Sequence, residues 1–178
     1  MERSDHDLMA RTAQGDAGAF RVLAGRHAGG ALRLARRITG NDALAEDIVQ
    51  DAMLRVWTNA PRWRPEAAFG TWLYRIVVNL CLNAKRRRPD LPLAEGEHVA
   101  DPATAADAQL EARERDQHLA AAIDALPERQ RAAIVLSYQE GLSNAEVAAV
   151  LDTSVSSVET LLVRAKRTLR AALDSDRT

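Results

Sequence analysis

A short segment bounded by prolines places a tryptophan between two arginines, in the order Pro61-Arg62-Trp63-Arg64-Pro65. An amphipathic stretch over residues 69–87 follows, and one side of its helical wheel carries Trp72, Arg75, Asn79 and Arg86. Guanidinium groups bind phosphates, aromatic rings stack on bases, and amides read base edges, so these residue types suit single-stranded DNA. The alternative is that Trp63 and Trp72 pack in a core and that the cations ending the stretch form a solvated helix end.

The C-terminal part of the chain contains a candidate helix-turn-helix. Ser143 can cap a helix over 144–151, with Glu146 at the capping-box position, and residues 152–154 can form the turn. The next helix has an apolar stripe made of Val158, Leu161, Leu162, Ala165, Leu169 and Ala172. Its opposite face carries small and basic side chains, namely Ser156, Thr160, Val163, Arg164, Arg167 and Arg170. Such a face suits the major groove, whereas two packed helices with a solvated basic face are the alternative.

Residues 42–59 are expected to form a helix with an acidic outer face. Its inward side is predicted to consist of Ala45, Val49, Ala52, Met53 and Val56. The opposite side presents Asp47, Gln50, Asp51 and Leu54. An exposed leucine within an acidic face is typical of a docking surface for a basic partner helix. An ordinary solvated face with one stray leucine is the alternative.

The residues that could support catalysis are too scattered to predict an active site. The histidines, at positions 6, 27, 98 and 118, lack metal-ligand spacing, and the chain has no glycine-rich phosphate loop. Cys81 lies in an apolar run without a nearby histidine, and a single cysteine excludes an internal disulfide and a cysteine-rich zinc site. We therefore expect no enzyme activity, no metal and no other cofactor.

Helices must position these residues, and apolar periodicity predicts helices nearly throughout the chain. We expect a first group at 5–14, 17–38, 42–59 and 69–87, and a second group at 108–125, 128–139, 144–151 and 155–173. The buried stripe of the 69–87 helix is predicted to be Phe69, Leu73, Ile76, Leu80 and Ala84. Residues 89–107 contain prolines and lack helical periodicity, which predicts a linker. The expected fold is all-α, with two small helical domains (1–88 and 108–178), an extended linker and a helix-turn-helix in the second domain.

The net charge of −1, from 24 cations and 25 acids among 178 residues, argues against a protein held on nucleic acid by bulk charge alone. The charge is unevenly divided along the chain. Residues 62–88 carry seven cations and one acid, residues 90–116 carry eight acids and two cations, and residues 155–170 carry four cations and one acid. This order of basic, acidic and basic segments fits two DNA-contacting domains joined by a tether that avoids DNA.

Composition and hydropathy predict a globular protein outside the membrane. Hydrophobic residues make up 47% of the chain and charged residues 28%, as in folded domains. No apolar run approaches the ~18 residues that span a bilayer. The first residues are polar and acidic and predict no signal peptide, so we expect a cytoplasmic protein without membrane insertion.

Four strings, in order along most of the chain, resemble the extracytoplasmic-function (ECF) sigma factors of bacterial RNA polymerase. They are AEDIVQD (45–51) with LRVW (54–57), FGTWLYRI (69–76) with Asn79, DALPERQR (124–131) and GLSNAEVA (141–148). Four ordered strings are far more specific than a lone helix-turn-helix. The chain is therefore identified as similar to a family whose members direct core polymerase to promoters and assist strand opening.

The resemblance implies a role for each surface. The Asp47, Gln50, Asp51 and Leu54 face would dock on the clamp helices of the polymerase β′ subunit. The 61–68 loop and its neighbours would capture flipped bases of the melted −10 element, with contacts from Arg62, Trp63, Arg64, Trp72, Arg75, Asn79 and Arg86. The linker would thread through the polymerase toward the RNA exit path. The second domain would contact the β flap and read the −35 element through Ser156, Thr160, Val163, Arg164 and Arg167.

The resemblance also implies that RNA synthesis belongs to the polymerase and that an anti-sigma factor covers these faces. Three residues depart from the family pattern. Asp152 stands where the turn usually has glycine, and Asp tolerates the left-handed conformation better than most residues. Glu159 and Leu161 stand where basic residues are usual; we expect Leu161 to pack and leave the effect of Glu159 open.

Two other functions stay open at this point. One is a free-standing helix-turn-helix regulator that binds duplex DNA without polymerase. The other is an adaptor that binds proteins only. The first predicts tight promoter binding by the chain alone, and the second predicts no DNA crosslink even with polymerase present.

Overall fold

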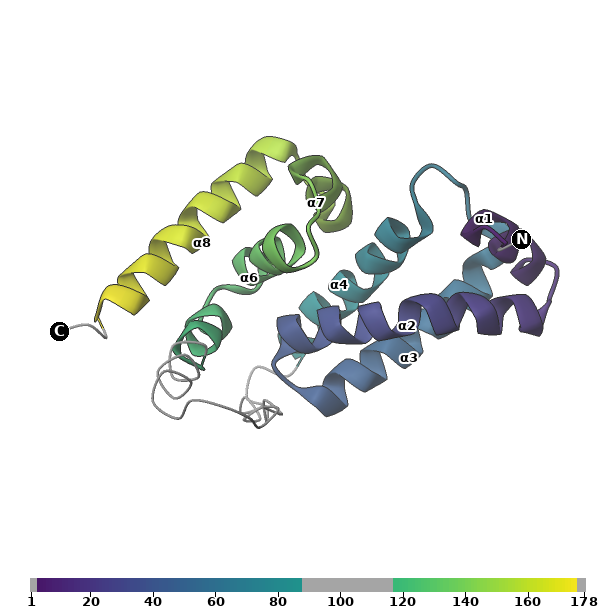
Figure 1. The fold of residues 1–178 in the computed structure, drawn as a ribbon, viewed down its shortest axis with the longest axis horizontal. Helices are drawn as coiled ribbons and strands as arrows, with labels where there is room; N and C mark the ends of the chain where they lie inside the picture. The colour runs from purple at the N-terminus through teal and green to yellow at the C-terminus, as the bar shows by residue number, and fades with distance from the viewer. Residues whose placement is uncertain (1–2, 88–116, 176–178) are drawn as a thin grey trace, which may run out of the picture.

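The computed structural model describes residues 3–87 and 117–175, and every regular element in these ranges is helical (Figure 1). The first group comprises α1 (Asp5–Thr12), α2 (Ala17–Thr39), α3 (Asp42–Asn59), the 3-10 turn η1 (Ala60–Arg62) and α4 (Phe69–Arg87). The second comprises a helical segment at 117–124, then α6 (Glu128–Ile134), η2 (Val135–Gln139), α7 (Asn144–Leu151) and α8 (Val155–Ser175). The prediction of an all-α fold is confirmed. The predicted linker over 89–107, and the first part of the helix predicted at 108–125, lie outside the described residues.

Short polar side chains set the helix boundaries in the first group. Ser4, Asp16 and Asn41 each accept a hydrogen bond from a first-turn backbone N–H, which satisfies a donor that has no partner within the helix. Gly40 ends α2 in the left-handed conformation, at φ 65°, where glycine carries no steric cost. These local signals explain why the predicted starts at residues 5, 17 and 42 agree with the structure.

The helix-turn-helix forms as predicted. Ser143 and Glu146 make a full capping box at the start of α7, and these hydrogen bonds hold the pKa of Glu146 below its usual range. Asp152 ends α7 in the left-handed conformation, with φ 51° and ψ 57°. An aspartate in this region replaces the usual glycine and still permits the tight turn into α8.

One predicted α-helix, 128–139, changes its winding. The α-helical part, α6, ends at Ile134, and residues 135–139 form a π-helical turn in which the Glu140 N–H donates to the Val135 carbonyl at 3.0 Å. A π-turn accommodates one more residue than an α-turn and therefore rotates every side chain after it. Apolar periodicity could not predict this change because it assumes a constant pitch.

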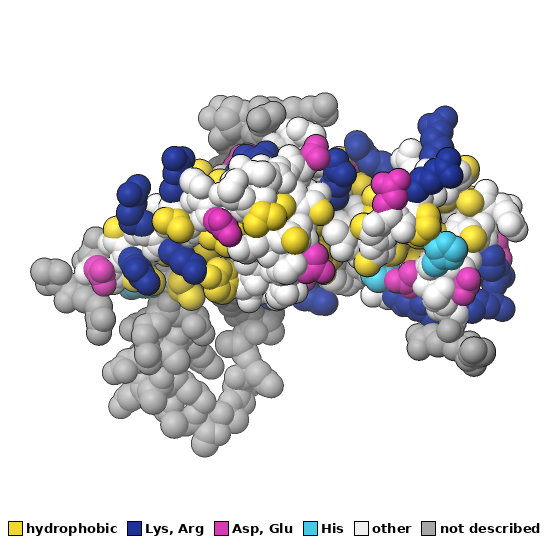
Figure 2. Space-filling model, turned by 90° about the horizontal axis from the view of Figure 1, so that it is seen from above, with side chains coloured by type: hydrophobic (Ala, Val, Ile, Leu, Met, Phe, Trp, Pro, Cys, Tyr) yellow, Lys and Arg dark blue, Asp and Glu magenta, His cyan; other side chains and the backbone are white. Residues whose placement is uncertain are grey.

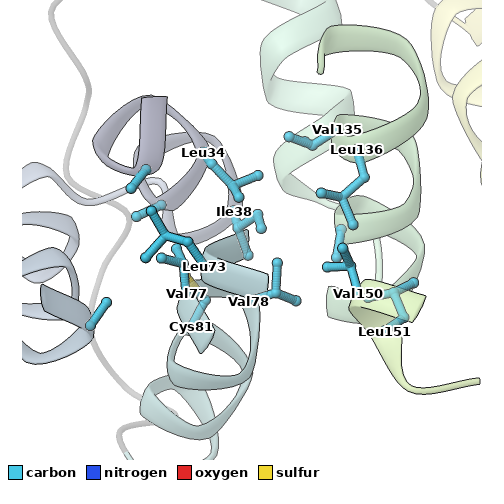
Figure 3. Close-up of a cluster of buried hydrophobic side chains, with 14 of the residues drawn as sticks. Leu34, Ile38, Leu73, Val77, Val78, Cys81, Val135, Leu136, Val150 and Leu151 are labelled. Carbon is cyan, nitrogen blue, oxygen red and sulfur yellow. The ribbon is translucent and has the colours of Figure 1, made fainter. Parts of the chain in front are cut away.

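The two helical groups share one apolar core (Figure 3). One wall consists of residues from α2 and α4, and the facing wall consists of residues from η2 and α7; the labelled members are Leu34, Ile38, Leu73, Val77, Val78, Cys81, Val135, Leu136, Val150 and Leu151. The two predicted domains therefore pack directly against each other.

This packing corrects the predicted stripe of α4. Phe69 and Leu73 are buried as expected, whereas Ile76, Leu80 and Ala84 are only half-buried. Fully buried positions are instead Val77, Val78 and Cys81. The predicted stripe packs against the core but was incomplete, because the prediction assumed one covered side, whereas α4 packs against α2, α3 and α7.

The stripe of α8 is largely as predicted. Val158, Leu162 and Ala165 are buried, and Leu161 and Leu169 are half-buried. The prediction was wrong for Ala172, which is exposed, and Leu173 is half-buried in its place. A helical stripe drifts around the axis over several turns, so its last member is the least well predicted.

Arg131 ties the two groups together from a buried position. Its side chain is 2% exposed, and its Nη1 donates to the Ile38 carbonyl at 3.0 Å, in the last turn of α2. Its Nη2 donates to the backbone carbonyls of Leu126, at 3.3 Å, and Asp124. Burial lowers the pKa of the guanidinium, and the Asp124 carboxylate at 3.6 Å opposes that shift. The Ile38 carbonyl lies in the last turn of α2, where it has no partner within the helix. Arg131 of the other group supplies the missing donor.

Candidate nucleic-acid and partner interfaces

A pocket of about 520 Å³ lies between the end of α3, the loop before α4 and the first turns of α4. Five predicted single-strand contacts line it together, namely Arg62, Trp63, Arg64, Trp72 and Arg75. The three arginines are exposed and the two tryptophans are half-buried. The pocket thus combines arginines and aromatic rings in its lining, together with one acid, Glu66.

Two predicted contacts do not join this pocket. Asn79 is exposed further along α4 but is not among the lining residues. The side chain of Arg86 lies outside the described part of the chain. The pocket is also lined by Arg55 and Asn59 from the last turns of α3, which were not predicted from the sequence. Because both residues lie close in sequence to the 61–68 loop, their place in the pocket could have been predicted.

The wall of the pocket is one end of a row of rings. The ring centroids of Trp63 and Trp72 are 6.3 Å apart, and those of Trp72 and Phe69 are 5.9 Å apart. His6 lies 5.8 Å behind Trp63, and His27 lies 4.8 Å from Phe69. Each tryptophan therefore packs against a neighbouring ring and also lines the pocket, and base contact stays a prediction.

Helix α1 braces this row. Asp5 pairs with His27 Nε2 at 2.6 Å and with Arg26 Nη1 at 2.9 Å, which fixes α1 to α2. His6, the next residue, then reaches the Trp63 ring. The N-terminal helix thereby holds the loop that carries the pocket.

The candidate −35 residues lie on an open helix face. Ser156, Thr160, Val163, Arg164 and Arg167 are all exposed on α8, and Val163 is 68% exposed. Glu159 is exposed on the same helix, whereas Leu161 is half-buried as expected. Figure 2, seen from above Figure 1, shows Lys and Arg side chains spread around the α8 end of the molecule. This face is geometrically free to meet a groove.

The candidate docking face of α3 is also accessible. Asp47, Gln50 and Leu54 are exposed, Leu54 by 61%, and Asp51 is half-exposed. Asp51 is engaged by Arg55, with N–O distances of 3.2 Å for both guanidinium contacts. Met53, predicted inward, is half-buried, while Ile48 is buried although it was not predicted. The leucine is thus a solvent-facing apolar side chain among polar ones.

Comparison with known proteins decides between the open functions. Family models for Sigma-70 region 2 and Sigma-70 region 4 match residues 23–89 and 117–169. The chain is 38% identical over 175 residues to the ECF RNA polymerase sigma factor SigM of Mycobacterium tuberculosis (strain ATCC 25618 / H37Rv), covering 97% of this chain and 86% of that protein. The chain belongs to the ECF sigma factor family. The predicted function is confirmed: this sigma factor acts with RNA polymerase and promoter DNA in transcription initiation.

Other relatives extend the likeness over nearly the whole sigma factor. RNA polymerase sigma factor CnrH of Cupriavidus metallidurans is 33% identical over 187 residues, covering 98% of this chain and 97% of CnrH. A solved structure of CnrH with the cytosolic domain of CnrY matches with a TM-score of 0.72 at 29% identity, over 98% of this chain and 99% of that chain. RpoE of Bartonella quintana, solved with the anti-sigma factor NepR, matches with a TM-score of 0.71 at 21% identity over 88% of this chain and 98% of that one, which supports the fold.

The described part of the sigma factor has few features of a metal, membrane or redox site. No group of three or more His, Cys, Asp or Glu there could hold a metal ion. No helix in the same ranges is long and apolar enough to cross a membrane. Cys81 is buried, and burial raises the pKa of its thiol to about 12.

Proposed function

We propose that this sigma factor divides promoter recognition between two surfaces and uses a third to bind polymerase. The −10 surface is Arg62, Trp63, Arg64, Trp72 and Arg75, to which the sequence adds Asn79 and Arg86. The −35 surface is Ser156, Thr160, Val163, Arg164 and Arg167. The docking surface is Asp47, Gln50, Asp51 and Leu54.

The observation that carries this proposal is the pocket of the −10 surface. Unstacked bases gain free energy by stacking on aromatic rings, by about 1–3 kcal/mol per base, whereas paired bases cannot reach such a wall. Trp63 and Trp72 supply that wall, and Arg62, Arg64 and Arg75 stand where the phosphates of an extruded strand would run. The pocket therefore favours the melted strand over the duplex, and this preference stabilises an opened promoter.

The −35 surface suits the duplex because it is a convex helix face without an aromatic wall. Arg164 and Arg167 can neutralise phosphates, while Thr160 and Ser156 are short enough to approach base edges. The helix-turn-helix geometry, with its capping box and left-handed Asp152, supports this use of α8.

We expect the docking surface to bind the β′ clamp helices and the second domain to bind the β flap. Exposed Leu54 offers an apolar anchor, and the surrounding acids complement basic residues on a partner helix. We take residues 1–88 and 108–178 as the two working units and 89–107 as the tether that crosses the polymerase. Because the tether is acidic, it avoids the path of the DNA.

We also propose how this sigma factor is regulated and where it acts in the cell. A chain related to CnrH and RpoE, which were solved with CnrY and the anti-sigma factor NepR, is expected to have an anti-sigma partner of its own. It acts in the cytoplasm, where polymerase is found. In this proposal RNA synthesis belongs to the polymerase, and the sigma factor itself supplies no catalytic residue.

Run-off transcription with purified core polymerase tests the proposal. The full chain, added to core enzyme, should produce discrete transcripts from some genomic promoters, and core enzyme alone should not. Tight binding of duplex promoter by the chain alone, with no redirection of polymerase, would instead indicate a free-standing regulator. Absence of any DNA crosslink in the presence of polymerase would indicate an adaptor.

The docking surface has its own test. Leu54→Ala should weaken core binding about five- to thirtyfold, the range expected for an interface anchor worth 1–2 kcal/mol. Asp51→Arg should weaken it further through charge reversal. Titration of labelled core enzyme measures both affinities, and circular dichroism should show unchanged helix content because Leu54 is 61% exposed and the Asp51 side chain is 45% exposed. A loss of helix would show that these residues are structural.

A further inference from the structure

The helix-turn-helix domain covers part of the −10 surface in this structure. Helix α7 packs along α4, and Ala149 of α7 is one of the residues lining the pocket, together with Trp72, Arg75 and Ile76 of α4. The −35 surface on α8 faces away and stays exposed. The contact between the two groups therefore affects one DNA-binding surface and leaves the other open.

A polar cluster fastens this contact. The carboxylate of Glu140, at the end of η2, accepts a hydrogen bond from the Tyr74 hydroxyl of α4 at 2.9 Å and pairs with Arg37 of α2 at 2.9 Å. The Glu140 side chain is only 11% exposed, so its carboxylate is largely shielded from water, whereas the Arg37 side chain is 41% exposed. Burial and the Glu140 carboxylate raise the pKa of Tyr74 to about 12, which keeps its hydroxyl a donor at neutral pH. The π-turn before Glu140 sets the direction in which this carboxylate points.

A second pair engages the −10 surface directly. Arg75 Nη2 lies 3.0 Å from the carboxylate of Asp152, the left-handed residue of the helix-turn-helix turn. Both side chains are largely exposed, so the pair contributes little to stability. It nevertheless occupies a guanidinium that DNA would need. The aspartate that departs from the family pattern thus has a partner in the other domain.

We infer that the helix-turn-helix domain and the melted −10 strand compete for the same face of α4. In the free chain the domain occupies this face, and the strand gains it only after the two domains separate. The inference rests on the proposed role of the −10 surface. It assigns to Glu140, Tyr74 and Arg37 the task of holding the chain closed, without any second protein.

An equilibrium between a closed and an open form determines whether a variant should bind single-stranded DNA more tightly or more weakly. If only the open form binds the strand, the apparent affinity falls in proportion to the open fraction. Loss of a contact that exists only in the closed form should therefore increase the affinity of the free chain for single-stranded DNA. A defect in folding or in the DNA-binding surface would decrease it.

Glu140→Ala is the main variant, because it removes both contacts of the carboxylate at once. The probe is a fluorescent non-template-strand oligonucleotide spanning the −10 region of a promoter found in the run-off assay. Small-angle scattering on the same samples reports whether the domains separate. We expect Glu140→Ala to increase the radius of gyration and to tighten oligonucleotide binding by at least about fivefold. Asp152→Asn, which keeps the turn and removes one exposed pair, should give a smaller gain.

Two further variants provide a control and an expected change in the opposite direction. Asp174→Asn removes one acid from an exposed position near the end of α8 and should change neither measurement. Ala149→Glu places a carboxylate on an exposed helical position beside the arginines of the pocket, so it should favour the closed form and weaken binding. This variant keeps a good helix former in α7, so it remains informative if Glu140→Ala does not fold.

The outcomes separate this inference from the proposed function. Tighter binding by the expanded Glu140→Ala variant and weaker binding by Ala149→Glu support the competition. An expanded variant with unchanged affinity, or a wild-type chain that is already expanded, overturns it while run-off transcription stays intact. A chain that activates no promoter with core polymerase overturns the proposed function itself.

Discussion

The arginines of the −10 surface lie on η1, on the loop before α4 and on α4 itself, beside two half-buried tryptophans, whereas the arginines of the −35 surface lie on an open face of α8. The cations are of the same kind in both places, and their surroundings differ. In the proposed function, the aromatic wall would hold bases that have left the duplex, while the convex face of α8 would enter a groove. On that proposal, the surroundings of an arginine, more than its charge, determine which form of DNA it binds.

The largest effect should come from Arg131, which joins the parts of the molecule that carry the two surfaces. Arg131→Ala leaves the carbonyls of Ile38 and Leu126 without their donor inside the core, so the free energy of unfolding should fall by about 3 kcal/mol. Urea denaturation measures this loss. Arg129→Ala, an exposed neighbour with one hydrogen bond to the Leu151 carbonyl, is the matched control and should cost less than about 1 kcal/mol. Equal losses for the two variants would show that Arg131 does not tie the groups together.

The next largest effect is expected from a substitution that changes only the −10 surface. Trp63→Ala removes a stacking wall and should slow open-complex formation about tenfold or more. Permanganate footprinting on duplex promoter measures opening, and protection of the −35 element should be unchanged. His6→Ala, which removes only the ring behind Trp63, should give a smaller defect that His6→Phe restores. Full opening by Trp63→Ala would mean that the ring serves packing alone.

A smaller effect isolates the −35 surface. Arg164→Ala should reduce −35-dependent transcription and lower the slope of log affinity against log salt by about one phosphate contact. Holoenzyme binding to a promoter fragment across a salt series measures the slope. Opening of a pre-melted promoter that lacks the −35 element should be unaffected. An unchanged slope would show that Arg164 does not reach the backbone.

The smallest expected effect is a gain, and not a loss, of DNA binding. Glu159 is exposed on α8 and would repel phosphates, so Glu159→Gln should improve holoenzyme binding to −35-containing duplex by about twofold. The same salt series measures this gain. A decrease would indicate that Glu159 accepts a hydrogen bond from a base, and the comparison of the two surfaces would then include specificity as well as charge.

Local signals in the sequence predicted much of this fold. The spans 42–59, 69–87 and 144–151 agree with the structure because a cap or a loop proline marks their ends. The capping box of Ser143 was predictable because it depends on neighbouring residues only, whereas the left-handed Asp152 was expected from the family resemblance. The −35 and docking faces followed from helical periodicity, since each lies on a helix with one covered side.

Long-range packing limited the rest. Val77, Val78 and Cys81 are buried because a second group of helices covers α4 from another side, and no wheel of α4 alone contains that information. The same contact brings Ala149 to the pocket and Arg131 to the end of α2. Their partners lie far away in the sequence, so their roles depend on the assembled fold.

Cys81 has a consequence for how this sigma factor can receive signals. It is the single cysteine of the chain, it is 1% exposed, and its pKa of about 12 leaves almost no thiolate at neutral pH. Peroxides and disulfides attack the thiolate, so this sulfur is chemically silent while the helices remain packed. While the two helical groups stay packed, Cys81 therefore offers no reactive thiolate, and an oxidant could reach it only after they separate.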